Sequence, residues 1–188
     1  QDHGKAYIDN IPRFDDFTIL PNNLNYQPVI ENCYNLYKEF THTPAQGSWY
    51  WSNVLMNHIF MEQYNLGIRY LQAMYLHPER SLPILVLVSK ERQTGKTTFL
   101  NWLNMIFGDN MVNISPEDLT GSFNHIYATS NIIAVEESLI EKAITVEKLK
   151  AIATAKFMTV NQKFVSQYKI PFYGKIILRS LLEILNNL

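Results

Sequence analysis

Apolar residues in the first third of the chain recur at the three- and four-residue spacing of helices with one buried face. This spacing predicts helices over 28–40, 49–64 and 66–76. The first of these would bury five residues on one side: Val29, Cys33, Leu36, Tyr37 and Phe40. Residues 1–27 are rich in Asn, Asp and Pro, so we expect an irregular segment there. The domain organisation predicted for 1–80 is therefore an irregular N-terminal segment followed by a small helical region.

From Pro83 onward, short apolar runs alternate with amphipathic stretches. Four of these runs predict strands: 84–88, 111–114, 132–135 and 175–178. The first run has the unbroken apolar character of a strand that is buried on both faces. The stretches between the runs predict helices over 97–107, with Gly108 ending it, and over 145–154. This alternation indicates an α/β fold over 81–188, with a mainly parallel sheet flanked by helices.

The composition agrees with one folded domain. Of 188 residues, 47% are hydrophobic and 13% aromatic, which supplies enough apolar surface for a sizeable core. The longest apolar run is far shorter than the ~20 residues that span a bilayer, so we expect no membrane segment and a cytoplasmic location. The chain starts at Gln1 without a signal pattern, and we expect it to be a piece of a longer protein. The histidines fall at no metal-ligand spacing, and Cys33 has no second cysteine to pair with.

Gly95-Lys96-Thr97 follows the apolar run 84–88 and begins a predicted helix. A loop between a buried strand and a helix is the context of a P-loop, where unpaired backbone N–H groups and the helix dipole bind phosphate. The predicted nucleotide-binding residues are Gln93, Thr94, Gly95, Lys96, Thr97 and Thr98. Lys96 would reach the β- and γ-phosphates of ATP, and Thr97 would offer its hydroxyl to Mg²⁺. Lys90 stands where the usual motif has its first glycine, so the turn there must be made differently.

Two acidic residues follow the apolar run 132–135. Glu136 would hold the Mg²⁺ together with Thr97, and Glu137 would activate the attacking water as general base. Glu137 and Lys96 are thus the predicted catalytic residues.

The net charge is −1, but the charges are distributed unevenly. Seven basic residues and no acidic one lie between Lys148 and Leu182: Lys148, Lys150, Lys156, Lys163, Lys169, Lys175 and Arg179. Residues 157–172 alternate like a hairpin around Asn161-Gln162, and Lys156, Lys163 and Lys169 would contact DNA phosphates there. The aromatic residues of this stretch would either stack on bases or pack beneath the hairpin, and we favour packing: Phe157, Phe164 and Tyr168.

With these motifs the chain resembles the superfamily 3 helicases, specifically the helicase part of phage- and plasmid-type primase-helicases, which are AAA+ ATPases. The resemblance covers about 57–180, with QTGKTTFLNWL as Walker A, IIAVEE as Walker B, and 149–180 as a B′ hairpin followed by motif C. It implies a P-loop NTPase of AAA+ type that forms a hexameric ring on single-stranded DNA or a replication fork, beside a primase domain or subunit. It also implies that Lys163, at the hairpin tip, contacts the DNA backbone.

The end of motif C departs from the family. Leu181 stands where family members have an asparagine that senses the γ-phosphate, and the chain ends at Leu188, before the segment that carries the family's arginine finger. We therefore expect a core truncated after motif C that binds ATP but turns it over barely above background. A non-hydrolysing ATPase-like module for assembly or DNA binding stays open. A small-molecule P-loop kinase is less favoured, because the five arginines do not cluster in the sequence.

Overall fold

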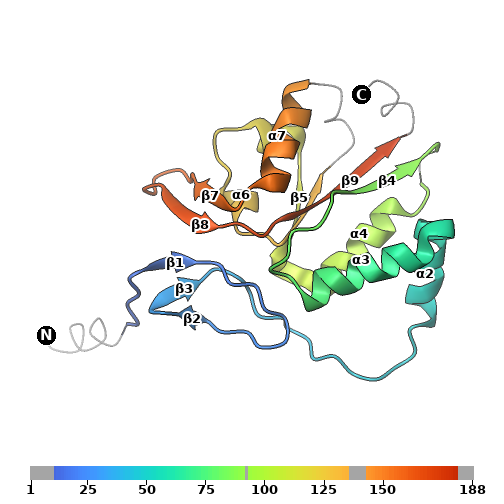
Figure 1. Ribbon diagram of the computed structural model, residues 1–188, viewed down its shortest axis with the longest axis horizontal. Coiled ribbons are helices and arrows are strands. Elements are labelled where there is room, and N and C mark those ends of the chain that lie inside the picture. Colours follow the sequence, from blue (N-terminus) through green and yellow to red (C-terminus); the bar gives the residue numbers. More distant parts are fainter. Residues whose placement is uncertain (1–10, 92, 136–142, 182–188) are drawn as a thin grey trace, which may run out of the picture.

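The computed structural model describes residues 11–91, 93–135 and 143–181. Within these ranges the chain forms a small N-terminal sheet, two packed helices, a four-stranded core sheet flanked by helices, and a two-stranded hairpin (Figure 1). All four core strands are parallel, which confirms the α/β fold class predicted from the alternation of strands and helices. None of the helices in these ranges combines the length and the apolar character that crossing a bilayer requires.

The N-terminal sheet stands where the sequence predicted a helix over 28–40. Its strands, in the order β1-β3-β2, are β1 (Asp16–Thr18), β2 (Val29–Ile30) and β3 (Cys33–Asn35). Glu31 and Asn32 turn the chain between β2 and β3 with φ angles of 46° and 63°. Positive φ angles do not occur within a right-handed helix of L-residues, so the helix prediction is wrong. The strand β1 also lies within the segment that was expected to be irregular.

A buried asparagine, Asn35, connects the N-terminal sheet to the segment before it. The Asn35 side chain accepts hydrogen bonds from the backbone N–H groups of Leu20 and Tyr37, at 3.0 and 3.1 Å. Its amide donates to the carbonyls of Leu20 and Gln27. Three of these four backbone groups belong to Leu20 and Gln27, before the predicted helix, so the Asn35 side chain joins the sheet to the segment that precedes it.

The two helices predicted next are confirmed. They are α2 (Tyr50–Phe60) and α3 (Tyr64–Leu76), joined by the short 3-10 helix η1 (Met61–Gln63). The buried Gly67 lets them pack closely, because a Cβ there would lie only 2.3 Å from the Phe60 ring. The helix α3 ends before His77-Pro78, as the sequence indicated.

The core sheet has the strand order β4-β9-β6-β5. Its strands are β4 (Leu85–Ser89), β5 (Met111–Ile114), β6 (Ile132–Val135) and β9 (Lys175–Leu181). Since β4 pairs only with β9 among the described residues, Val86 and Val88 stay 39% exposed. The prediction that this strand is buried on both faces is therefore wrong, whereas all four residues of β6 are buried.

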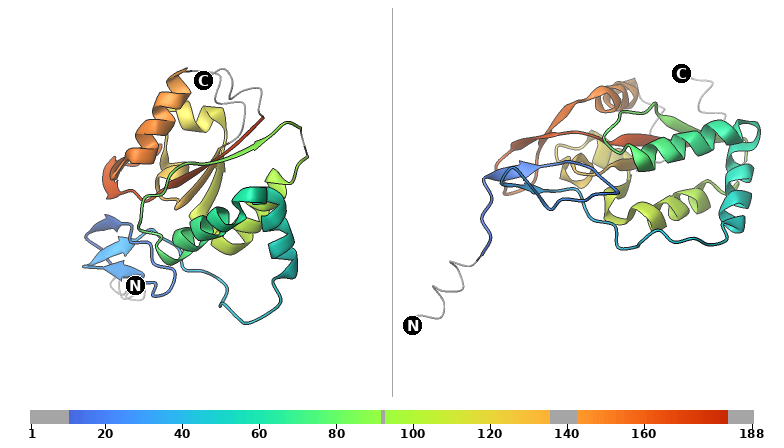
Figure 2. Two further views of the ribbon diagram at one scale, coloured as in Figure 1. Left: turned by 45° about the vertical axis from the view of Figure 1, so that its right-hand side comes forward. Right: turned by 60° about the horizontal axis from the view of Figure 1, so that its bottom comes forward.

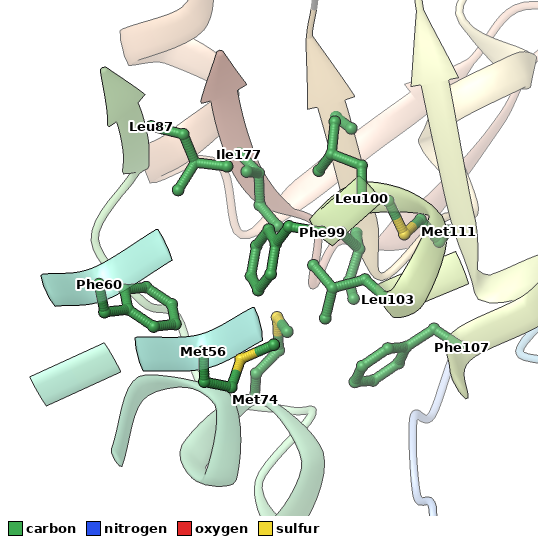
Figure 3. Close-up of a cluster of buried hydrophobic side chains, with 12 residues drawn as sticks. Met56, Phe60, Met74, Leu87, Phe99, Leu100, Leu103, Phe107, Met111 and Ile177 are labelled. Atoms are coloured by element: carbon green, nitrogen blue, oxygen red, sulfur yellow. The ribbon is translucent and has the colours of Figure 1, made fainter. Parts of the chain in front are cut away.

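Helices cover both faces of this sheet. On one face lies α4 (Lys96–Phe107), and on the other lies α7 (Ala143–Thr154) (Figure 2). On the α4 side, Phe99, Leu100 and Leu103 pack between the strands and the two helices α2 and α3 (Figure 3). Three short helices complete the core: η2 (Gly108–Asn110), α5 (Pro116–Thr120) and α6 (His125–Ala128). Gly108 ends α4 with a φ of 49°, as predicted.

The predicted hairpin is present and packs against the N-terminal sheet. It consists of β7 (Phe157–Val160) and the antiparallel β8 (Tyr168–Pro171), with a connecting loop at 161–167 that is longer than the two-residue turn the sequence suggested. Val160 and Ile170 from the hairpin are buried together with Ile19 and Tyr37. The hairpin base is therefore anchored between the N-terminal sheet and the core.

A buried lysine lies at the start of β9. Lys175 is only 1% exposed, and its ammonium donates to the carbonyls of Pro78 and Tyr173. The side-chain amide of Asn131 donates to the same two carbonyls. Burial lowers the pKa of Lys175 to about 8, although the nearby Glu79 opposes this shift.

Candidate functional site

The connection between β4 and α4, called the 90–95 loop below, is described at residues 90, 91 and 93–95. Gln93 has a φ of 59° and Gly95 a φ of 84°, so both adopt the left-handed region. At Gly95 the absence of a side chain also matters for packing, because a Cβ would lie 3.3 Å from Cδ2 of His58. The helix α4 starts directly afterwards at Lys96. The first N–H groups of α4 have no side-chain cap among the described residues.

Lys96 folds back across this loop. Its half-buried side chain donates through Nζ to Ser89 Oγ, at the end of β4, and approaches Thr94 Oγ1 at 3.4 Å. None of the acidic residues in the described part of the chain forms an ion pair with it. A cation held by neutral hydroxyls beside the positive end of a helix dipole creates a site that favours an anion.

Two further residues contact the 90–95 loop or the first turn of α4 from elsewhere in the chain. Nε2 of His58, in α2, lies 3.2 Å from the carbonyl oxygen of Thr94. Nη1 of Arg179, in β9, donates to Thr97 Oγ1 at 3.1 Å. Sequence reasoning gave neither residue a role in this site. The one available signal was the apolar run 175–178, which placed Arg179 at the end of a strand but did not show that this strand neighbours β4.

A cavity of about 730 Å³ opens beside the loop. It lies between β4 and the segment formed by α2 and η1, and its walls are mostly apolar, with Ile59, Phe60 and Met61 on one side. His58, Thr94 and Lys96 also line it. Its volume is within the range of small-molecule sites, and the polar groups stand where the cavity meets the loop.

The structure describes all of the predicted nucleotide-binding residues but only one of the predicted metal ligands. Gln93, Thr94 and Gly95 end the loop that follows β4, and Lys96, Thr97 and Thr98 form the first turn of α4. Glu136 and Glu137, predicted to hold Mg²⁺ and to activate water, lie outside the described residues. The described residues contain no group of three His, Cys, Asp or Glu side chains arranged to hold a metal ion. Of the proposed metal ligands, only Thr97 can therefore be placed, and its side chain is exposed.

The hairpin presents lysines and aromatic rings to solvent. Lys163 Nζ lies 5.0 Å from the Phe164 ring centroid, and Lys169 Nζ lies 5.0 Å from that of Phe157. Phe164 is 94% exposed and Phe157 57% exposed, so the interpretation that these rings pack beneath the hairpin is wrong. The interpretation that an aromatic ring packs beneath the hairpin is right only for Tyr168, which is half-buried and contacts Phe17 of β1.

The basic surface is smaller than the sequence suggested. Lys175 is buried, Arg179 contacts Thr97 in α4, and Lys150 pairs with Glu147 at 3.0 Å. Lys156, Lys163 and Lys169, the predicted DNA contacts, are all exposed at or near the hairpin. The hairpin and the 90–95 loop lie at different ends of the core (Figures 1 and 2).

A protein-family model matches residues 87–180, which is 94 of the 188 residues. Its description is "Family of unknown function (DUF5906)". The chain belongs to this family. The DUF5906 match begins in β4 and ends in β9, so it includes the 90–95 loop, the hairpin and Arg179. No curated protein matches the chain.

Solved structures of the NrS-1 C-terminal region share the fold of this DUF5906 chain. The A form apo structure of this region has 20% sequence identity to the chain and a TM-score of 0.73. The match covers 87% of this chain and 42% of that one. A second apo structure of the same region has a TM-score of 0.71 at the same identity and coverage. At this identity the likeness shows the fold alone. The chain spans less than half the length of these structures.

Proposed function

We propose that the chain is the ATP-binding core of a DNA helicase domain, part of a phage-type replication protein that works beside a primase. One observation carries the proposal. Lys96 crosses a tight left-handed turn at the start of α4, next to a cavity with room for a nucleoside. A lysine, unpaired helix N–H groups and an adjoining apolar cavity are the parts that binding of a nucleoside triphosphate needs.

The groups around the loop have distinct roles in this proposal. The apolar cavity takes the nucleoside, the first turn of α4 and Lys96 bind the phosphates, and Thr97 offers its exposed hydroxyl to Mg²⁺. Glu136 would complete the metal site and Glu137 would accept a proton from the attacking water, both by the sequence motif alone. The metal ion would neutralise charge on the β- and γ-phosphates.

The hairpin supplies the DNA contact in this proposal. Its exposed lysines can neutralise phosphates, and the exposed rings of Phe157 and Phe164 can stack on bases of a single strand. The resemblance to ring-forming helicases makes a hexamer around DNA the proposed assembly. The fold shared with the NrS-1 C-terminal region supports the α/β core on which this proposal rests.

A nucleotide-binding module that does not hydrolyse ATP is the second candidate. It is favoured by Leu181, which replaces the γ-phosphate-sensing asparagine of the helicases that the chain resembles. The two candidates differ in phosphate release from saturating ATP with Mg²⁺ and single-stranded DNA. Turnover near background favours the second candidate, and turnover near one per second, lost in Glu137→Gln, favours the first.

Thermal unfolding with and without ATP and Mg²⁺ tests the shared step, nucleotide binding. At 100 times Kd, a ligand that binds only the folded state stabilises it by about 2.7 kcal/mol, or roughly 5–10 °C for a domain of this size. We expect Lys96→Ala to remove this rise in Tm. Lys90→Ala removes an exposed lysine from the same loop and is expected to keep most of it. If millimolar ATP leaves the wild-type Tm unchanged, the proposed function is wrong.

A further inference from the structure

The exposed part of the hairpin loop depends on its two ends for its conformation. Residues 162–167 are all exposed, so none of their side chains anchors the loop in the core. Within this stretch, the backbone N–H of Val165 donates to the carbonyl of Gln162 at 3.3 Å. Phe164 has a φ of 63°, a conformation that is costly for a bulky residue. A loop of this kind keeps its shape only through contacts at the residues that begin and end it.

Asn124, the residue before α6, makes such contacts at the start of the loop. Its Oδ1 accepts from the backbone N–H of Asn161 at 2.7 Å, and its Nδ2 donates to the carbonyl of Thr159 at 2.8 Å. The backbone N–H of Asn124 donates to the carbonyl of Asn161 at 3.2 Å. In the other direction, Nδ2 of Asn161 donates to the carbonyl of Ser122 at 2.7 Å. These hydrogen bonds join the first residue of the hairpin loop to the segment before α6.

The side chain of Asn124 takes the place of a neighbouring strand. Among the described residues, β7 pairs with β8 alone, which leaves its other edge open. Thr159 and Asn161 are two residues apart, so their backbone groups point to the same edge of the strand. The primary amide of Asn124 both donates and accepts there, as the peptide group of a third strand would. The open edge of β7 is thereby closed directly before the loop.

The contacts of Asn124 act on the part of the hairpin that is proposed to bind DNA. Lys163 and Phe164 follow Asn161 by two and three residues, and their ammonium and ring are exposed. At the other end of the loop, Tyr168 packs against Phe17 of β1. Only neutral amides take part at Asn124, so its contacts set the direction of the loop without changing the charge of the surface. A binding loop that is already ordered loses less conformational entropy when its ligand binds.

We infer that Asn124 is a positioning residue for DNA binding. It fixes the start of the hairpin loop, so that Lys163 and Phe164 are held ready for a single strand before that strand arrives. The inference rests on the proposed function, in which the hairpin contacts DNA, and it adds a residue from outside the hairpin that does not touch the DNA itself.

The affinity for labelled single-stranded oligonucleotides tests this inference. It is measured by fluorescence anisotropy at several salt concentrations and well below the Tm of each variant. Asn124→Ala removes two hydrogen bonds and no charge. We expect the affinity to fall about threefold to tenfold, as when side chains must first be ordered on binding. The slope of log affinity against log salt should stay at its wild-type value, because the phosphate contacts are the same. Asn104→Ala makes the same change at an exposed residue of α4 and should leave the affinity unchanged.

A merely structural role for Asn124 has a different signature. It would lower the Tm of Asn124→Ala and leave the DNA affinity of the folded chain at its wild-type value, and that result overturns the inference. A shallower salt slope for Asn124→Ala also overturns it, because a phosphate contact would then have been lost. Asn161→Ala removes one hydrogen bond, to the carbonyl of Ser122, and should weaken DNA binding less than Asn124→Ala does.

The outcomes also separate the inference from the proposed function. If the wild type binds no single-stranded DNA, the DNA contact of the proposed function is overturned and the inference with it. If it binds DNA and Asn124→Ala binds equally well, only the inference is overturned. The rise in Tm with ATP should be the same in Asn124→Ala as in the wild type. Should Asn124→Ala fail to fold, Asn161→Ala carries the test, with an expected fall in affinity of about twofold relative to Asn104→Ala.

Discussion

At the start of α4, directly after the 90–95 loop, Lys96 is half-buried and its ammonium is held by hydroxyls of Ser89 and Thr94. At the hairpin, Lys163 is exposed and lies over the ring of Phe164, itself 94% exposed. Lys96 and Arg179 converge on the first turn of α4, whereas Lys156, Lys163 and Lys169 lie apart, before β7, in the hairpin loop and in β8. Convergent, positioned cations suit a compact anion, and dispersed cations with open rings suit a long polyanion.

The difference shows how the same residue type acquires different uses from its surroundings. Lys96 is surrounded by the end of a strand, a tight turn and the first turn of a helix. The environment of Lys163 comes from solvent and one neighbouring ring. Lys175, on the strand that also carries Arg179, is a third case, in which burial removes the cation from any surface.

The largest effect is expected at Lys175, the lysine that burial changes most. Its pKa is about 8 in the folded chain and about 10.4 in an unfolded one, so between these values the unfolded state binds more protons. The free energy of unfolding should therefore rise with pH from about 8 to 10, by up to about 3 kcal/mol from this group. The Tyr70 pKa, raised by burial to about 12, opposes the rise only at higher pH, where the unfolded tyrosine loses its proton first.

Urea unfolding at pH 7.5, 8.5 and 9.5 measures this contribution. Lys175→Met should remove most of the rise, because it removes the group that titrates. The variant should still fold, because the carbonyls of Pro78 and Tyr173 keep their hydrogen bonds from Asn131. Lys156→Met removes an exposed lysine, and its pH dependence should match the wild type. A wild-type stability that is flat or falls across this range would contradict the assigned environment of Lys175.

A smaller effect on stability is expected at Gly95, on the loop side of the comparison. Gly95→Ala places a side chain at a φ of 84° and 3.3 Å from His58 Cδ2, which costs about 1–3 kcal/mol or distorts the turn. We expect a lower Tm and loss of the stabilisation by ATP. Gly47→Ala is the matched control, because nothing lies within 4 Å of the added Cβ, and it should change stability by less than about 0.5 kcal/mol. A Gly95→Ala chain that still responds fully to ATP would show that the turn tolerates another geometry.

The sequence predicted the elements of the core because its signals there are local. Apolar runs marked β5 and β6, and the Gly108 cap marked the end of α4. The N-terminal sheet was missed because Asn35 binds the backbone of Leu20 and Gln27, fifteen and eight residues away, and no spacing rule contains such contacts. Tertiary hydrogen bonds thus overrode an apparent helical pattern.

The candidate site also contains residues that the sequence predicted and residues that it did not. Lys96 and Thr97 were predictable, because they follow one another in a motif. His58 and Arg179 were not, because they are 36 and 82 residues from the atoms they contact. Arg179 reaches Thr97 only because β9 lies between β4 and β6, and strand order cannot be read from an alternation of strands and helices. Exposure of Phe164 likewise depends on the longer hairpin loop.

The smallest effect is expected at Lys163, on the hairpin side. As an exposed lysine in a loop, it can contact one phosphate from many positions, so its loss should weaken binding of single-stranded DNA about equally for all base sequences. A plot of log affinity against log salt should become shallower by about 0.7, the value for one phosphate contact on a single strand. Fluorescence anisotropy with labelled oligonucleotides at several salt concentrations measures both quantities. Lys90→Ala removes the same charge at the 90–95 loop and should leave the slope unchanged. The reverse result, a shallower slope for Lys90→Ala and none for Lys163→Ala, would place the polyanion at the loop and remove the distinction between the two regions.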